Sequence, residues 1–188
     1  MKKIRKGEFG YLKYQTMFEI IKTLVLLALC IGIYYLGIYS TGDNKNLLTF
    51  VAVLGVLPMA RCAVTAVLFV KSKHCSKELY DELTNKGLSP DFYDLFLTDY
   101  KVNYQLSALI LRKGCVAAYS EDPRIDTKAG EEHIEKMLKN AGFTDLTIKI
   151  FTDKDKFITR LSELSQFEIS EEGNSREKIL ENILSISI

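Results

Sequence analysis

The sequence has too little proline, glycine and cysteine for several classes of protein. Its 188 residues include 3 Pro, 11 Gly and 4 Cys, while 47% of them are hydrophobic and 26% are charged. This composition argues against an intrinsically disordered chain, a collagen-like chain and a disulfide-rich secreted miniprotein. The length fits one or two domains.

Several motifs that carry chemistry are also missing. The chain has no P-loop, no G-x-G-x-x-G, no G-x-S-x-G and no H-E-x-x-H. No two cysteines have C-x-x-C spacing, and His74-Cys75 with one further histidine falls short of the roughly four ligands of a zinc site. The predicted strands also lack the acid and Glu-x-Lys pair of a restriction-endonuclease type nuclease. We therefore expect no cofactor and no metal, and we assign no catalytic residue.

The formal net charge of +1 hides an uneven distribution of charge. Residues 1–22 carry six Lys and Arg against two acids, whereas residues 87–188 carry thirteen against eighteen. The acidic second half argues against nucleic-acid binding by that part. The basic N-terminus suits anionic lipid headgroups and the control of membrane topology.

A long apolar run near the N-terminus predicts a membrane span. Residues 23–39 contain no charge, and a helix over residues 17–39 would be about 34 Å long at roughly 1.5 Å per residue. Because the hydrocarbon core of a bilayer is about 30 Å thick, this helix can cross it.

A second apolar run, residues 47–70, contains one charge, Arg61, and one proline, Pro58. An arginine near the centre of a span costs roughly 2.5–3.5 kcal/mol on insertion scales, but the Leu, Val and Phe residues here contribute about −4 to −8 kcal/mol together. We therefore expect a second span. The short polar connection, residues 40–46, makes the pair an antiparallel hairpin over residues 17–70.

The basic residues predict the orientation of this hairpin. Both flanks are basic and the connection has a single lysine: Lys2, Lys3, Arg5, Lys6 and Lys13 come before the first span, Lys71, Lys73 and Lys77 follow the second, and Lys45 lies between them. The positive-inside rule then predicts a multi-pass protein of the cell membrane with both termini in the cytoplasm, and residues 1–16 form a basic cytoplasmic segment. The alternative is that residues 1–42 are a cleaved signal peptide, although residues 40–42 make a poor cleavage site.

Residues 71–188 are expected to form a small cytoplasmic α+β domain. The patterns predict helices over residues 76–86, 129–141, 153–164 and 175–187, and strands over residues 92–98, 104–112, 115–120 and 145–151. The last helix is expected to open with a capping box at residues 174–177. The crossover through residues 129–141 suggests a mixed sheet with helices mainly on one face. Alternation puts Tyr93, Leu95 and Leu97 on one face of the first strand.

Arg61 is the first candidate site residue, because an ionisable group at membrane depth is a functional-site hypothesis by default. It could contact an anion or a lipid headgroup, or make an interhelical bond in a homo-oligomer; alternatively, it snorkels to the cytoplasmic headgroups. The small-residue pairs Ala28/Gly32 and Cys62/Ala66 fit either packing of the hairpin on itself or dimerisation.

The acidic region 121–133 is the second candidate and supplies Asp122, Asp126, Glu132 and His133. Its carboxylates could bind a divalent ion, or His133 could act as a general base. The alternative is that acids at the start of a helix complement its dipole.

Several stretches resemble a group of uncharacterised two-span membrane proteins from low-GC Gram-positive bacteria. They are residues 1–14, NLLT at 46–49, VLGVLPMAR at 53–61, residues 93–100, EEHI at 131–134 and KIF at 149–151. The resemblance covers most of the chain and implies the two-span architecture. In that group a lysine often stands at the position of Arg61, which implies that a basic group matters there. The resemblance brings no activity, cofactor or catalytic residue.

These patterns favour a membrane-anchored cytoplasmic binding or regulatory module that does no catalysis. Its expected partners are the lipid bilayer, a second copy of the chain or a cytoplasmic protein, and not nucleic acid. Two alternatives stay open: an oligomeric transport or channel component in which Arg61 lines the path, and a membrane-tethered enzyme that uses the acidic region 121–133.

Overall fold

The computed structural model describes residues 4–99, 102–167 and 173–187, with the side chains of residues 173 and 174 excepted. The chain divides into two compact units. One, the hairpin unit, is Lys13–Ser72; the other, the α+β unit, combines Met1–Leu12 with Lys73–Ile188. The segment before the hairpin is therefore part of the unit that contains the sheet.

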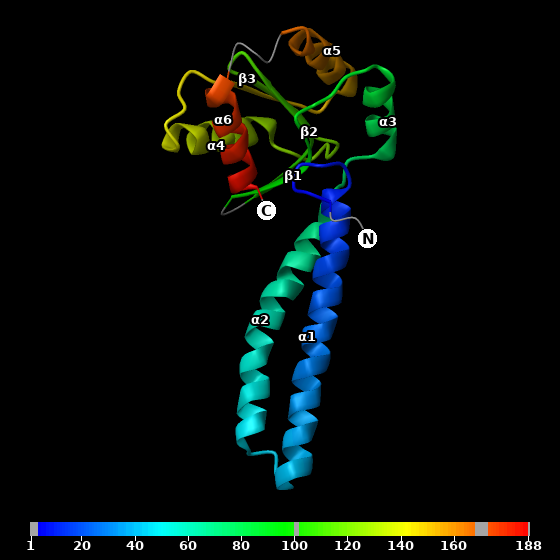
Figure 1. Cartoon of the computed structure of the whole chain (residues 1–188), viewed down its shortest axis with the longest axis vertical. Helices are drawn as coiled ribbons and strands as arrows, with labels where there is room; N and C mark the ends of the chain where they lie inside the picture. The colour runs from blue at the N-terminus through cyan, green and yellow to red at the C-terminus, as the bar shows by residue number, and fades with distance from the viewer. Residues whose placement is uncertain (1–3, 100–101, 168–172, 188) are drawn as a thin grey trace. The chain divides into compact units, whose positions relative to one another are not determined.

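The hairpin unit consists of two long antiparallel helices, α1 (Tyr11–Thr41) and α2 (Leu47–Lys71), drawn in blue and cyan in Figure 1. Both are long and apolar enough to cross a membrane. The start of α2 agrees with the prediction, and Asn46 caps it by accepting the Thr49 backbone N–H at 2.8 Å. Helix α1 begins six residues earlier than predicted, directly after Gly10, whose φ of 81° ends the preceding turn.

Small residues let the two helices approach closely, but only one of the two predicted pairs takes part. Cys62 and Ala66 are buried in the stripe of α2 that faces α1. A Cβ on Gly55 would lie 2.8 Å from the Cys30 Sγ, whereas one on Gly32 would meet nothing within 4 Å. The pair Cys62/Ala66 therefore packs the hairpin on itself, and Gly32 faces away from its partner helix.

The α+β unit contains one four-stranded mixed sheet, as the sequence predicts. Its strands are β1 (Phe92–Thr98), β2 (Asn103–Arg112), β3 (Cys115–Tyr119) and β4 (Thr147–Phe151), in that spatial order. The first two pairings are antiparallel and the third is parallel. Lys113 and Gly114 both have positive φ in the tight β2–β3 turn, which suits the right-handed twist of the strands.

The prediction that helices lie mainly on one face of the sheet is wrong. Helices α4 (Thr127–Asn140) and α6 (Gly173–Ile186) cover one face, and α3 (Lys77–Asn85) and α5 (Lys154–Ser165) cover the other (Figure 1). Both faces of β2 and β3 are apolar, so each face requires its own cover. The predicted capping box is also wrong, because α6 already begins at Gly173 and Asn174 lies inside it.

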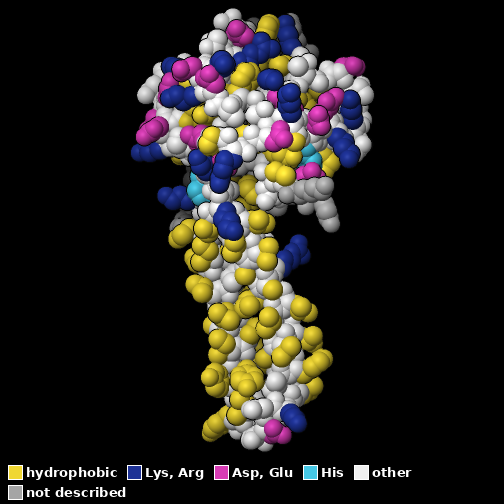
Figure 2. Space-filling model, turned by 180° about the vertical axis from the view of Figure 1, so that it is seen from behind, with side chains coloured by type: hydrophobic (Ala, Val, Ile, Leu, Met, Phe, Trp, Pro, Cys, Tyr) yellow, Lys and Arg dark blue, Asp and Glu magenta, His cyan; other side chains and the backbone are white. Residues whose placement is uncertain are grey.

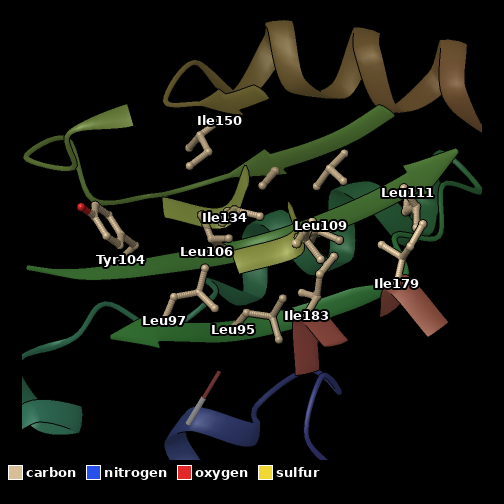
Figure 3. Packing of buried hydrophobic residues seen from close by; sticks show 13 residues of the cluster. Leu95, Leu97, Tyr104, Leu106, Leu109, Leu111, Ile134, Ile150, Ile179 and Ile183 are labelled. Carbon is tan, nitrogen blue, oxygen red and sulfur yellow. The ribbon is translucent and has the colours of Figure 1, made fainter. Parts of the chain in front are cut away.

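Two hydrophobic cores follow from this arrangement. Figure 3 shows the first, in which Leu95 and Leu97 of β1 face Ile183 of α6, and Ile134 of α4 lies over β2. The second core joins leucines of α3 and Phe157 and Leu161 of α5 to the opposite face. The helix predicted over residues 153–164 is confirmed, with its bounds shifted by one residue.

The face prediction for β1 fails at Tyr93. Leu95 and Leu97 belong to the first core, but Tyr93 packs against the second. Asp94, between them, has a φ of 50°, which is left-handed backbone that a non-glycine residue rarely adopts. This residue interrupts the alternation of the strand, so the side chain before it points to the other face.

The segment before the hairpin covers the outer edge of β1. The Tyr93 N–H donates to the Gly7 carbonyl at 2.7 Å, and Leu97 forms an antiparallel bridge with Ser187 near the C-terminus. Phe9 stacks on Tyr80 with ring centroids 4.2 Å apart. The edge that would otherwise invite pairing with another chain is thus occupied on both halves of the strand.

Candidate functional site

The structure gives two of the predicted acids local structural roles. Asp122 lies half-buried in the loop after β3 and pairs with Arg124 at 3.1 Å, and this arginine lowers the Asp122 pKa. Asp126 is the N-cap of α4, where its carboxylate accepts the Ala129 backbone N–H at 3.1 Å. Such caps stabilise a helix by satisfying N–H groups that lack an intrahelical partner.

His133 is the best enclosed of the predicted site residues. Its side chain is 9% exposed, and its Nδ1 lies 3.6 Å from the Asp99 Oδ1. The imidazole leans on the Tyr104 ring, with centroids 5.6 Å apart. Within the described part of the chain, its Nε2 has no hydrogen-bond partner.

Tyr104 is the residue around which part of the predicted acidic region gathers. Burial raises the pKa of its hydroxyl, and the carboxylates of Asp99, Asp126 and Glu132 raise it further. Asp122 is not among them. Glu132 is exposed and also borders a shallow hollow on the outer side of α4. No three His, Cys, Asp or Glu side chains come close enough to hold a metal ion, as far as the described residues go.

The strongest polar site of the α+β unit is one that the sequence analysis missed. Asp94 is 1% exposed, within the strand β1. One of its carboxylate oxygens accepts the Cys75 N–H at 2.6 Å, and the other accepts the Gly10 N–H at 2.8 Å. Gly10 immediately precedes α1, and Cys75 follows the end of α2 by four residues. A single carboxylate therefore binds both chain segments that flank the hairpin.

A second carboxylate extends this arrangement. Glu121 accepts the Ser76 N–H at 2.8 Å and the Ser107 hydroxyl at 3.3 Å. Ser107 accepts in turn from the Gln105 amide at 3.4 Å. We call Asp94, Gln105, Ser107 and Glu121 the flank cluster. All four residues belong to the α+β unit, as do the flanking residues that they bind.

The electrostatics of the flank cluster are dominated by burial. Burial raises the Asp94 pKa; the N–H groups of Cys75 and Gly10 and the nearby His74 oppose this, and Glu121 adds to it. Burial also raises the pKa of the Cys75 thiol, and both carboxylates raise it further. Since the thiolate is the nucleophilic form of cysteine, Cys75 is not activated for chemistry.

A buried ion cluster closes the other end of β2. Asp91 pairs with Arg112 at 2.9 Å and also with Arg176 of α6, and it accepts the Leu111 backbone N–H at 2.7 Å. The Asp91 and Arg112 side chains are only 10% and 7% exposed. Arg112 is the last residue of β2, and through Asp91 this cluster ties the end of the sheet to Arg176 of α6.

Arg61 lies on α2 with an exposed side chain. Its carbonyl accepts the Thr65 hydroxyl at 3.1 Å. Its guanidinium has no ion-pair or hydrogen-bond partner in the described hairpin. The guanidinium of Arg61 is therefore free to bind a group outside the hairpin.

The sequence carried one signal for the flank cluster. Asp94 is a charged residue in the middle of an apolar strand, and buried carboxylates need partners. The bonds to Gly10 and Cys75 join positions 84 and 19 residues away, so no local pattern announces them.

Comparison with known proteins adds no relative. The chain matches no protein-family model, and neither the curated proteins nor the solved structures gave a match. Its function must therefore be argued from its own residues.

Proposed function

We propose that the protein is a two-span integral membrane protein whose hairpin anchors the α+β unit in the cytoplasm, where this unit acts as a binding or regulatory module. The observation that carries the proposal is the bonding of Asp94 to both Gly10 and Cys75. A carboxylate that binds both flanks ties the two chain segments that lead into and out of the hairpin to the sheet.

The contrast between the two units supports membrane anchoring. Large apolar side chains are exposed along both helices of the hairpin, for example Leu24, Val53 and Val64. Among the described residues of the α+β unit, the large apolar side chains that stay exposed are Val102 and Phe167. An exposed apolar surface of this extent is stable in contact with lipid, whereas the α+β unit has the surface of a water-soluble domain.

The charges support the proposed orientation. Arg5 and Lys6 precede α1, and Lys71 and Lys73 mark the end of α2, whereas the connection at the far end carries Lys45. An excess of basic residues marks the cytoplasmic side of a span. The proposal thus assigns the flanks and the α+β unit to the cytoplasm and the connection to the outside.

Protease protection in intact cells and in lysed cells tests this anchoring. A protease site inserted between Asp43 and Asn46 should be cut from outside in intact cells, and the α+β unit should be cut only after lysis. Alkaline carbonate should leave the protein in the membrane pellet. Release by carbonate, or cleavage of the α+β unit in intact cells, would contradict the proposal.

Crosslinking mass spectrometry on cells that express the full chain tests the binding role. We expect crosslinks from the α+β unit to one cytoplasmic protein, reduced by Asp94→Asn and retained by Asp81→Asn, an exposed matched control on α3. Recovery of no protein above the level of a hairpin-only control would argue against a protein-binding module.

A further inference from the structure

Two contacts fix the alignment of α1 and α2 within the hairpin unit. A Cβ added to Gly55 of α2 would lie 2.8 Å from the Sγ of Cys30 on α1, so the two helices approach closely at this pair. Seven residues further along α1, a Cβ on Gly37 would lie 2.9 Å from the Cβ of Leu48. Seven residues along α1 thus correspond to seven along α2, and the same antiparallel register, continued toward the start of α1, brings residues 22 and 23 level with Cys62.

This register brings Arg61 to the level of Lys22. Arg61 directly precedes Cys62, so their Cα atoms differ in height by about 1.5 Å. Lys22 pairs with Glu19 at 3.1 Å. We call Glu19, Lys22 and Arg61 the charged level of the hairpin. Because Glu19 offsets the charge of Lys22, Arg61 supplies the uncompensated positive charge.

The charged level bounds an apolar slab of membrane thickness. Residues 23–41 of α1 carry no charge and extend about 28 Å at roughly 1.5 Å per residue. The hydrocarbon core of a bilayer is about 30 Å thick. Charges reappear at the opposite end in Asp43 and Lys45. Figure 2 shows the apolar side chains along the hairpin and the charged side chains at its tip.

From this geometry we infer that Arg61 is a phospholipid-binding residue at the inner membrane interface, where its guanidinium binds the phosphate of an anionic lipid. The inference rests on the proposed membrane anchoring. A guanidinium can bind phosphate through two parallel hydrogen bonds, and the free guanidinium of Arg61 has this capacity available. When α2 is considered alone, the position of Arg61 within the run 47–70 suggests the centre of the bilayer. The alignment with α1 instead puts Arg61 at the interface.

The depth of α2 can be measured directly because the chain has no tryptophan. Val64 and Val53 are both exposed on α2, 61% and 62%, one on each side of Arg61. In full-length protein reconstituted with brominated lipids, Val64→Trp should be quenched best by shallow bromine and Val53→Trp by deep bromine. Equal, deep quenching at both positions would overturn the inference. No quenching at either position would overturn the membrane proposal as well.

Lipid binding is tested by native mass spectrometry of the full chain extracted from bilayers of phosphatidylglycerol and phosphatidylcholine. Arg61→Leu should lower the ratio of retained phosphatidylglycerol to phosphatidylcholine about fivefold. Arg61→Lys should restore part of the preference, and Lys45→Leu, at the opposite end, should leave it unchanged. An unchanged ratio in Arg61→Leu would overturn the assignment even if the depth result holds.

Discussion

Gly10 donates its backbone N–H to the Asp94 carboxylate across 84 residues of sequence, and the entire hairpin lies between them in the chain. The α+β unit is therefore completed by a segment that precedes the hairpin.

Replacing Asp94 by asparagine should destabilise the α+β unit. An amide has one acceptor oxygen, so it cannot serve both the Gly10 and the Cys75 N–H, and its own NH₂ needs a new acceptor in a buried position. We expect a loss of about 1–3 kcal/mol in the free energy of unfolding. Urea unfolding of the full chain in detergent measures it, with Asp81→Asn as the control; equal stability of the two variants would contradict the role assigned to Asp94.

The stability of the α+β unit should also depend on the ionisation of Asp94. Because its pKa is raised in the folded protein, the folded state binds the proton more tightly than the unfolded state. The contribution of Asp94 to stability is then greatest below the ordinary carboxyl pKa and falls as pH rises through its folded pKa. Charges that act on Asp94 in the fold are those of His74 and Glu121, with the Cys75 thiol close by.

The measurement is the pH dependence of unfolding in wild type and in Asp94→Asn. The wild-type curve should decline relative to the variant between the ordinary carboxyl pKa and the raised one. A difference between the two curves that stays constant with pH would show that Asp94 titrates normally.

The ion cluster at Asp91 should be asymmetric in its response to mutation. Asp91→Asn leaves two guanidiniums without their carboxylate in a buried site, and we expect a loss of about 3–5 kcal/mol. Arg176→Gln should cost less, because Asp91 keeps its pair with Arg112. Unfolding free energies of both variants and the double variant measure the coupling; additive losses would argue against a shared cluster.

Two glycines of the hairpin should respond in opposite ways to alanine. At Gly55 the new methyl group would meet the Cys30 Sγ, so Gly55→Ala should lower the melting temperature in detergent. At Gly32 the space is open, and alanine should be neutral or should stabilise the helix by up to about 1 kcal/mol. The reverse order of melting temperatures would contradict the helix alignment.

Substitutions at Asp126 separate a capping role from a chemical one. Asparagine is as good an N-cap as aspartate, so Asp126→Asn should keep the stability of the α+β unit, while Asp126→Ala should lose about 0.5–2 kcal/mol. Thermal unfolding of the two variants measures these losses and so distinguishes the capping role from a chemical one. Equal destabilisation by both would mean that the charge itself is required there.

Sequence patterns were sufficient for β1 and α5, whose structure depends on near neighbours. Strand β1 and helix α5 were predicted at or within one residue of their bounds, because alternation and an Asp153 cap are local signals. Helix α1 was predicted too short because the prediction followed the uncharged apolar run, whereas Tyr11–Thr16 continue the helix with mixed polarity. The face of Tyr93 was missed because the left-handed backbone at Asp94 follows from buried bonds to distant residues.

The candidate site residues also differ in how far their positions depend on contacts between distant parts of the sequence. The capping role of Asp126 was not predicted, because α4 begins two residues before the predicted start at residue 129. The gathering of Asp99 and His133 at Tyr104 requires the β1–β2 pairing and the placement of α4. The flank cluster requires more, since residues from both sides of the hairpin must meet one strand.

The pairing of Gly7 with Tyr93 has a consequence for biosynthesis. Residues 4–10 leave the ribosome before the hairpin, but β1, the strand whose edge they cover, is made only after both apolar helices. The sheet edge can therefore be sealed only once the hairpin has been synthesised and its two flanks have come together. Completion of the fold would then report successful assembly of the hairpin, and a chain whose helices fail to pair would keep an open strand edge for quality-control proteases to recognise.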